Sequence, residues 1–382
     1  EAAIFKAAEK MNCESSFIQQ KNLLKEGDEF PYGQIVERCQ TQTSWSALEE
    51  KKSIAETKKR IDEFNAKNEW KKKGFALMPI CFGISFTNTM MNQASALVHI
   101  YTDGSVGIST AAVEMGQGVN MKIHRIAEKI FSINAERIKL ETTNTTRVAN
   151  TSPTAASSGA DLNGMATQLA CNVLLERLKE FAAKKLNQLD VKKIEIRDEK
   201  IFNDGKETEW KWEKLIAEAN AARVSLSSQH FYSTPKIHFN RETSKGHPFA
   251  YHVYGTSLFE VTMDCLRGTY EIDAVNVVHD AGKSLHPAID LSQVEGAMMQ
   301  GIGWMTMEEI IYNAEGRLLT DALSTYKVPD IHFSPKEMNV HFLKNSENPY
   351  APFNSKAIGE PPFMYGIGVY FALMNAVKAF RP

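Results

Sequence analysis

The stretch YHVYGTSLFEVTMDCLRGTYEIDAVNVVHD, residues 251–280, decides the fold class. It holds two long runs rich in β-branched and aromatic residues, 251–264 and 269–280, separated by the short segment 265–268. Two such runs joined by a turn that contains glycine are typical of a β-hairpin. Helical patterns lie on both sides of this pair without strict alternation of strand and helix. The sequence therefore predicts an α+β fold with mixed sheets and helices.

Further elements are predicted on both sides of the hairpin. Apolar residues at helical spacing predict helices at about 119–131, 161–185, 291–303 and 366–379. Strand patterns occur at 137–143 and 338–344, and a second hairpin is predicted at 95–110. The Asp103-Gly104 dipeptide in that hairpin is typical of a type I′ turn. The apolar stretch Gly366 to Val377 is too short to cross a bilayer, so we expect a core helix there.

The chain divides into three predicted regions. At about 150 residues per domain, a chain of 382 residues should contain two or three domains or lobes. Residues 1–73 are charge-dense with thin apolar faces, which predicts an N-terminal helical connecting region. Residues 74–190 and 191–382 are predicted as two mixed sheet-plus-helix lobes, although 190–240 is polar and contains tryptophan. The second lobe carries a loop with Glu360.

Charge and cysteine content argue against several classes of function. Lysine and arginine number 44, aspartate and glutamate 46, and the formal net charge is −2. This balance argues against a nucleic-acid partner and against binding to an anionic membrane. The five cysteines form no Cys-x-x-Cys pair, so no iron–sulfur cluster, zinc site or disulfide framework is predicted, and a cytoplasmic location is expected. They are Cys13, Cys39, Cys81, Cys171 and Cys265.

The first of three loops suited to chemistry is Glu114-Met115-Gly116-Gln117-Gly118. Gly116 and Gly118 let a ligand approach the backbone closely, and Gln117 adds an amide that donates and accepts hydrogen bonds. Free N–H groups at the start of the following helix would attract an anion such as phosphate. An ordinary tight turn has the same composition, so this loop alone leaves both interpretations open.

The second loop, NTSPTAASSG at 150–159, is rich in hydroxyl and small side chains. Hydroxyl groups such as those of Thr154, Ser157 and Ser158 supply hydrogen bonds, and the small residues leave space for a ligand. The loop leads into a predicted helix. A loop that only caps this helix would have the same composition.

The third loop is Gly359-Glu360-Pro361-Pro362. The two prolines fix the backbone and remove two N–H groups, so Glu360 projects from a rigid turn before a helix. A carboxylate on a rigid support suits a general base. An acidic residue that complements the dipole of the following helix would look the same.

Together and in this order, the three loops resemble the xanthine dehydrogenase and aldehyde oxidase family of molybdenum hydroxylases. The resemblance extends over most of the chain, and FGISFT and NTSPTAAS favour the xanthine dehydrogenase branch. It is carried by WKKKGFALMPICFGISFT (70–87), VEMGQGVNMK (113–122), NTSPTAASSGADLNG (150–164), HPAIDLSQVEGAMMQGIG (286–303), STYKVPDI (324–331) and SKAIGEPPF (355–363). This resemblance implies that both lobes form part of a molybdopterin-binding region, in the C-terminal half of the molybdopterin-binding subunit.

The resemblance implies a hydroxylase whose molybdenum is held by the dithiolene of a pyranopterin, in some members as the cytosine dinucleotide, with no protein ligand to the metal. Water-derived oxygen is inserted at an electron-poor heterocycle C–H, and hydride passes to the sulfido ligand. The branch favours xanthine or hypoxanthine, and hence purine catabolism. Alternatives are a hydroxylase of another N-heterocycle such as nicotinate, or of an aldehyde, and a non-catalytic half that binds only cofactor or partners.

The resemblance also implies a role for individual residues. Glu360 matches the catalytic base. The cofactor-binding positions are Gly116, Gln117, Gly118, Thr154, Ser157, Ser158 and Gln293. The substrate-binding positions are Phe86, Thr87, Ala155 and Ala156. One departure is His286, which stands where the family usually has asparagine.

Finally, the resemblance implies partners for this chain. The chain begins at Glu1 and lacks the first half of the family's molybdenum subunit, including its FRGFG-type loop. An N-terminal molybdopterin half is therefore expected on another chain or segment. Iron–sulfur clusters and FAD are expected on partner chains or domains of a multi-subunit complex, because the cysteines here do not suit a cluster.

Overall fold

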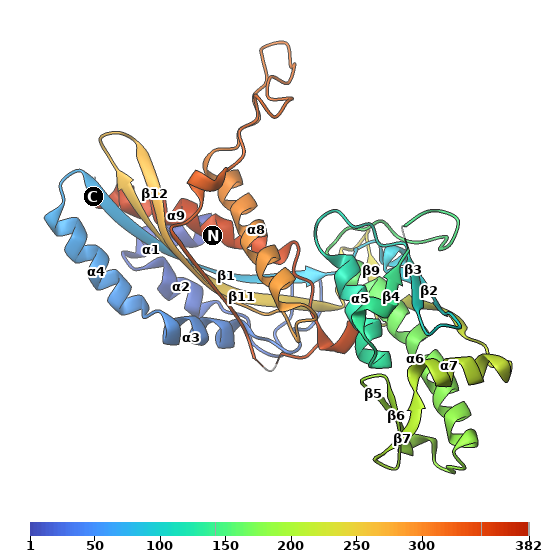
Figure 1. Cartoon of the computed structure of the whole chain (residues 1–382). Coiled ribbons are helices and arrows are strands. Elements are labelled where there is room, and N and C mark those ends of the chain that lie inside the picture. Colours follow the sequence, from blue (N-terminus) through green and yellow to red (C-terminus); the bar gives the residue numbers. More distant parts are fainter. Residues whose placement is uncertain (142, 345, 381–382) are drawn as a thin grey trace.

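The structure is a computed structural model that describes residues 1–141, 143–344 and 346–380. Figure 1 shows two bodies side by side. The terminal body is formed by residues 1–84 and 251–380, and the middle body by residues 93–233. Both combine sheets with helices, so the predicted α+β class is confirmed.

A four-stranded sheet forms the centre of the terminal body. In spatial order its strands are β1 (Lys71–Ile84), β11 (Tyr251–Asp264), β12 (Thr269–His279) and β13 (Glu337–Phe342). β11 is antiparallel to both β1 and β12, whereas β13 is parallel to β12. The hairpin predicted from residues 251–280 and the strand predicted at 338–344 are therefore confirmed.

Helices cover both faces of this sheet. They are α1 (Ala2–Met11), α2 (Ser15–Lys21), α3 (Thr41–Lys51), α4 (Ile54–Lys67), α8 (Pro287–Thr306) and α9 (Ile367–Phe380). Successive side chains of a strand point to opposite faces. Accordingly, Met78 of β1 packs with α8 and α9, while its neighbour Leu77 packs with Leu48 of α3.

The last helix is a core helix, as predicted. The segment Pro361–Phe380 is long and apolar enough to cross a membrane by length and composition alone, which is a weak indication of a membrane protein. In the structure Val369, Ala372 and Ala376 of α9 are buried in the cluster that covers the sheet. Packing against the sheet therefore accounts for the apolar character of this helix.

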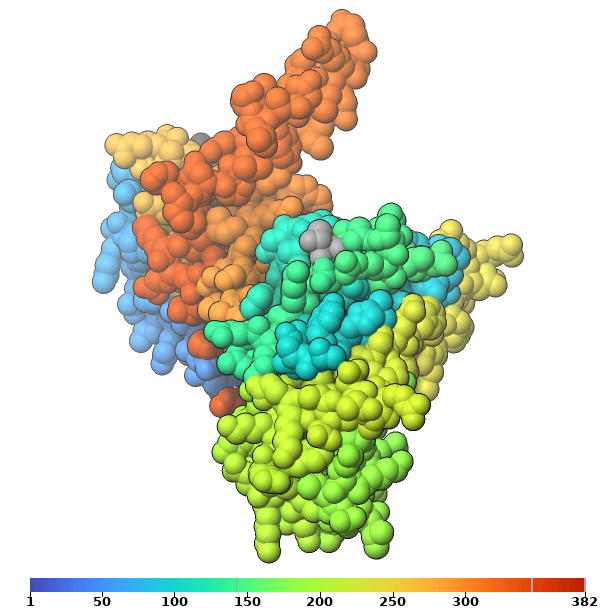
Figure 2. Space-filling view, turned by 45° about the vertical axis from the view of Figure 1, so that its right-hand side comes forward, coloured from blue at the N-terminus to red at the C-terminus, as the bar shows by residue number. Residues whose placement is uncertain are grey.

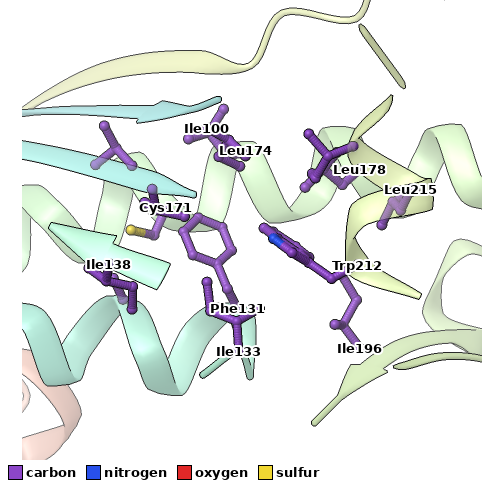
Figure 3. Close-up of a cluster of buried hydrophobic side chains, with 14 of the residues drawn as sticks. Ile100, Phe131, Ile133, Ile138, Cys171, Leu174, Leu178, Ile196, Trp212 and Leu215 are labelled. Atoms are coloured by element: carbon purple, nitrogen blue, oxygen red, sulfur yellow. The ribbon is translucent and has the colours of Figure 1, made fainter. Parts of the chain in front are cut away.

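The middle body contains a second four-stranded sheet, covered by long helices. In spatial order its strands are β4 (Ile138–Leu140), β3 (Val106–Thr110), β2 (Gln93–Ile100) and β8 (Ser227–Ser233). Its helices are α5 (Val119–Phe131), α6 (Gly159–Lys185) and α7 (Trp212–Ala221). Phe131, Leu174 and Trp212 meet in its core (Figure 3). The structure confirms the helices predicted at 119–131 and 161–185, whereas the strand predicted at 137–143 is shorter, and its residue 142 lies outside the described residues.

The polar region 190–240 contains elements that the sequence did not reveal. A three-stranded sheet is formed by β5 (Ile194–Arg197), β6 (Lys200–Asn203) and β7 (Lys206–Lys211), and α7 follows directly. The indole N–H of Trp212 donates to the carbonyl oxygen of Gly104 at 2.7 Å, which ties this region to the hairpin of β2 and β3. The remaining pair of strands is β9 (His238–Asn240) and β10 (Lys245–His247).

Short 3₁₀ turns complete the described structure. They are η1 (Thr89–Met91), η2 (Ala135–Arg137), η3 (Val191–Lys193), η4 (Ile331–Phe333), η5 (Pro352–Asn354) and η6 (Pro361–Gly366).

The turn between β2 and β3 differs from the prediction. A type I′ turn needs positive φ at both central residues. Gly104 has a φ of 85°, but Asp103 does not have a positive φ. The N–H of Tyr101 donates to Ser105 O and the N–H of Gly104 to Tyr101 O. The type I′ prediction is therefore wrong, because the loop is one residue longer and ends in a glycine bulge.

Sheet pairing divides the chain differently from the predicted regions. The predicted boundary at residue 74 falls within β1, and β1 pairs along its whole length with β11 from the 191–382 region. Residues 194–233, also assigned to that region, belong to the middle body. Backbone hydrogen bonds between distant segments, which local patterns do not reveal, therefore decide which segments share a body.

An arm projects from the terminal body between α8 and β13 (Figures 1 and 2). We define the arm as residues 307–335. It contains the isolated bridge Tyr312 to Leu318, hydrogen-bonded turns at 313–316 and 322–326, and the short 3₁₀ turn η4. Large apolar side chains are exposed along it, including those of Leu323 (91% exposed) and Ile331 (79% exposed). The arm therefore presents apolar surface that this chain itself does not cover.

Candidate functional site

All three loops singled out from the sequence line one pocket, which has a volume of about 340 Å³. The Gly-Gln-Gly loop and the 150–159 loop come from the middle body, whereas the Glu360 loop comes from the terminal body. The pocket therefore lies where the two bodies meet. The candidate residues that line it are Gln117, Thr154, Ala155, Ala156, Ser157, Gln293 and Glu360.

The other candidate residues do not line this pocket. Gly116, Gly118 and Ser158 are neighbours of lining residues in the same loops. Phe86 and Thr87 lie just after β1, where the backbone of Phe86 exchanges hydrogen bonds with the side chain of Asn92. Among the described residues, most cofactor-binding candidates therefore line one pocket. Phe86 and Thr87, two of the substrate-binding candidates, lie outside it.

The helix start after the Gly-Gln-Gly loop already holds an anion. The carboxylate of Glu114 accepts hydrogen bonds from the backbone N–H groups of Gly116, Gly118 and Asn120 at 2.8–3.0 Å. Burial tends to raise the pKa of Glu114, but these bonds outweigh it and lower the pKa. The expectation of free N–H groups is therefore wrong for Gly116, Gly118 and Asn120, because a side chain of the same loop occupies them.

The start of α6 is different, because it has no side-chain cap and its first-turn residues line the pocket. Ser158 is the N-cap residue, but its hydroxyl donates to Ala155 O instead of accepting from the helix. Gly159, Ala160 and Asp161 of the first turn all line the pocket. Helix starts carry partial positive charge and unsatisfied donors. This end of the pocket is thus suited to an anionic group.

Glu360 is held at the edge of the pocket by Ser157. The Ser157 hydroxyl donates to Oε2 of Glu360 at 2.9 Å and accepts from the backbone N–H of Glu360 at 2.8 Å. The side chain of Glu360 is exposed, and η6 begins immediately after it. The predicted rigid support is present, because Pro361 and Pro362 are buried at the start of η6.

Two buried lysines line the pocket, each neutralised by a buried aspartate. Lys122 pairs with Asp290 at 2.6 Å, and Lys356 pairs with Asp280 at 2.5 Å. Sequence analysis missed both lysines. For Lys122 a signal existed, since it interrupts the apolar face of a predicted helix beside Val119 and Ile123.

Asp161, also missed, ties the two sides of the pocket together through Tyr251. The Tyr251 hydroxyl donates to the carboxylate of Asp161 and accepts from the backbone N–H of Ala357. Burial raises the pKa of Asp161 to about 7, although the tyrosine hydroxyl and the charge of Lys122 act to lower it. Burial likewise raises the pKa of Tyr251 well above its ordinary value. A carboxyl group that titrates near neutrality therefore lines the pocket.

Comparison with known proteins identifies the family. Residues 47–335 match the family model described as molybdopterin cofactor-binding domain. The chain belongs to this family. It is 39% identical over 364 residues to xanthine dehydrogenase/oxidase of Rattus norvegicus, covering 95% of this chain and 26% of the relative. It is 37% identical over 381 residues to aldehyde oxidase 2 of Mus musculus, covering 100% of this chain and 27% of the relative. The chain thus spans about a quarter of the length of these relatives.

Solved structures show the same fold. Quinoline 2-oxidoreductase from Pseudomonas putida 86 superposes with a TM-score of 0.84 at 21% identity, covering 98% of this chain and 48% of that one. The Cu,Mo-CO dehydrogenase superposes with a TM-score of 0.85 at 18% identity, covering 99% of this chain and 48% of that one. At these identities the likeness shows the fold alone.

The pocket residues of this molybdopterin-binding chain fit the family's anionic pterin cofactor. The amide of Gln293 makes no hydrogen bond to the described residues and is free for a ligand. The uncapped start of α6 offers N–H donors. The two buried lysines are each paired with an aspartate and add no net charge. Among the described residues no group of three or more His, Cys, Asp or Glu is arranged to hold a metal ion.

Proposed function

We propose that this chain forms part of a molybdenum-pterin hydroxylase of the xanthine dehydrogenase type. The observation that carries the proposal is the single pocket lined by the Gly-Gln-Gly loop, the 150–159 loop and Glu360. The similarity to xanthine dehydrogenase/oxidase over nearly the whole chain supports it. The cofactor carries the redox chemistry. The protein therefore needs three features: hydrogen-bond donors that hold the anionic cofactor, a base, and a slot for a planar substrate.

The pocket residues divide into two roles. Gln117, Gln293, Thr154, Ser158 and the start of α6 hold the cofactor, and Gly116 and Gly118 shape the turn around Gln117. The Gln117 amide accepts from Met115 N–H and donates to Val113 O, which leaves its second N–H for the cofactor. When bound, the molybdenum group supplies the two-electron oxidation. Glu360 takes up the proton of the attacking water-derived oxygen at its carboxylate. Ala155 and Ala156 leave space beside the substrate.

Xanthine or hypoxanthine is the proposed substrate, which would place the chain in purine catabolism. Phe86 and Thr87 are proposed to complete the substrate slot, although they lie outside the pocket formed by this chain alone. The second candidate is an aldehyde, favoured by the 37% identity to an aldehyde oxidase, with another heterocycle such as nicotinate as the remaining alternative. Turnover of an aldehyde or nicotinate without turnover of xanthine or hypoxanthine would select the corresponding alternative.

The proposed partners are the rest of the molybdopterin-binding region and the chains or domains that carry iron–sulfur clusters and FAD. The chain covers 48% of the solved molybdenum enzymes that it superposes on, which supports a complementary half. The apolar arm, 307–335, is proposed to pack against that half. A cytoplasmic location fits an enzyme of this kind.

The test is the substitution Glu360→Gln in the assembled enzyme. We expect molybdenum content to stay at the wild-type level, because the amide keeps the size of the side chain. Turnover should fall about 10²- to 10⁴-fold, since general base catalysis contributes on that order. The matched control is Glu209→Gln, at an exposed position of β7 outside the pocket. Undiminished turnover of Glu360→Gln would leave a non-catalytic, cofactor-binding role for this chain.

A further inference from the structure

One hydroxyl group makes two hydrogen bonds to Glu360. Ser157 Oγ lies 2.9 Å from Oε2 and 2.8 Å from the backbone nitrogen of Glu360. A hydroxyl has one donor and two acceptor sites, so it satisfies both bonds at once by donating to the carboxylate and accepting from the N–H. The two residues are 203 positions apart in sequence and come from different bodies.

The position of this hydroxyl is fixed by the backbone on both sides. Ala156 and Ser157 have φ values of 53° and 52°, a left-handed conformation that non-glycine residues adopt rarely. Opposite them, a Cβ on Gly359 would lie 2.9 Å from Ser157 Oγ, so glycine permits the close approach. Strained backbone of this kind persists where the surrounding structure holds it, often at functional sites.

We propose that Ser157 is a positioning residue that fixes the orientation of the Glu360 carboxylate. The proposal rests on the proposed function of Glu360 as base and deepens it. With Oε2 engaged by Ser157, Oε1 accepts no hydrogen bond from the described residues. Oε1 is therefore the oxygen that takes up the substrate-side proton, while Ser157 prevents rotation of the carboxylate. With one bond donated and one accepted, the hydroxyl has a single acceptor site left for the cofactor contact also proposed for Ser157.

The kinetic test uses Ser157→Ala and Ser157→Gly in the assembled enzyme. Both remove the hydroxyl, and glycine also relaxes the left-handed backbone. We expect both to lower kcat about tenfold to a hundredfold, the range for a lost hydrogen bond to a charged group. KM and molybdenum content should change little. The control is Ser132→Ala, because Ser132 also has a left-handed φ of 52° and a hydroxyl that accepts a backbone N–H, from Asp198.

A second measurement does not depend on turnover. Infrared difference spectra of the cofactor-free enzyme, wild type minus Glu360→Gln, isolate the carboxylate stretch of Glu360. We expect Ser157→Ala to shift this band, because Oε2 loses its donor, and Ser132→Ala to leave it unchanged. An unshifted band, or a loss of molybdenum without a shift, would overturn the positioning role. If instead Glu360→Gln keeps full turnover while the band shifts, the contact stands and the proposed function of Glu360 fails.

Discussion

At the scale of single residues, the Asp161 carboxyl group is buried in the first turn of α6, beneath the hydroxyl of Tyr251. Burial raises its pKa from 3.8 to about 7. The folded protein therefore retains this proton at pH values where the unfolded chain has lost it. A raised pKa of this kind favours the folded state at low pH, and the advantage is lost as the pH rises towards 7.

Asp161→Asn should weaken the dependence of stability on pH. For wild type, the free energy of unfolding should fall as pH rises from about 4 to about 7, by up to about 1.4 kcal/mol per pH unit from this one group. The asparagine cannot titrate but still accepts from the Tyr251 hydroxyl. Urea unfolding at several pH values between 5 and 8 measures both slopes. Equal slopes for the two proteins would show that Asp161 is ionised throughout this range.

At the scale of elements, α8 and η6 approach each other closely just after Glu360. A Cβ on Gly301 of α8 would lie 2.2 Å from the carbonyl oxygen of Phe363 in η6. A Cβ on Gly296, five residues earlier in the same helix, would meet nothing within 4 Å. The chain therefore offers a matched pair of glycines on one helix, of which one supports the Glu360 loop.

Gly301→Ala should destabilise the protein by about 1–3 kcal/mol, the usual cost of overpacking a close contact. Gly296→Ala should instead stabilise it by up to about 1 kcal/mol, because alanine is the better helix former at an open position. Thermal unfolding of both variants measures the difference. If Gly301→Ala is as stable as Gly296→Ala, η6 moves freely relative to α8 and does not support Glu360.

Periodic elements were predictable from sequence, and elements built on short or charged strands were not. The helix at 119–131 has the predicted bounds because apolar residues recur on one face over its whole length. β5 to β7 escaped notice because they are four to six residues long and carry many exposed charged side chains. Sheet partners such as β1 and β11 pair across more than 160 residues of sequence, a distance that local patterns do not bridge.

For the candidate site, the sequence likewise revealed some of the residues and not others. The unusual loops around Gln117, Ser157 and Glu360 could be found, because glycine, serine and proline runs break the periodic pattern. Lys356 could not be identified as a site residue, since a charged side chain in a sequence is usually solvent-exposed. Lys122 was missed although it interrupts the apolar face of a predicted helix. Only the buried aspartates opposite them, brought in by the fold, explain their presence.

At the scale of the whole molecule, the arm carries the apolar surface that we propose packs against the rest of the molybdopterin-binding region. The aspartate substitutions Leu323→Asp and Ile331→Asp should weaken association with the rest of the molybdopterin-binding region. Each buried side chain of this size contributes about 1.5–3 kcal/mol, so a loss of at least about tenfold in affinity is expected for each. Native mass spectrometry of the complex measures the fraction of chain that remains bound.

The control for the arm is Leu189→Asp, at a fully exposed leucine of the middle body. It should leave assembly unchanged. Unaltered assembly of both arm variants would show that the complementary half binds elsewhere. Self-association that depends on the arm would identify a second copy of this chain as the occupant.

The Glu114 carboxylate in the Gly-Gln-Gly turn has a consequence for the protein without its cofactor. The Glu114 carboxylate accepts hydrogen bonds from the backbone N–H groups of Gly116, Gly118 and Asn120. The loop therefore provides the anion that its own N–H groups require. On this side of the pocket, the conformation of the turn is therefore stabilised by the chain itself and does not depend on a bound anion.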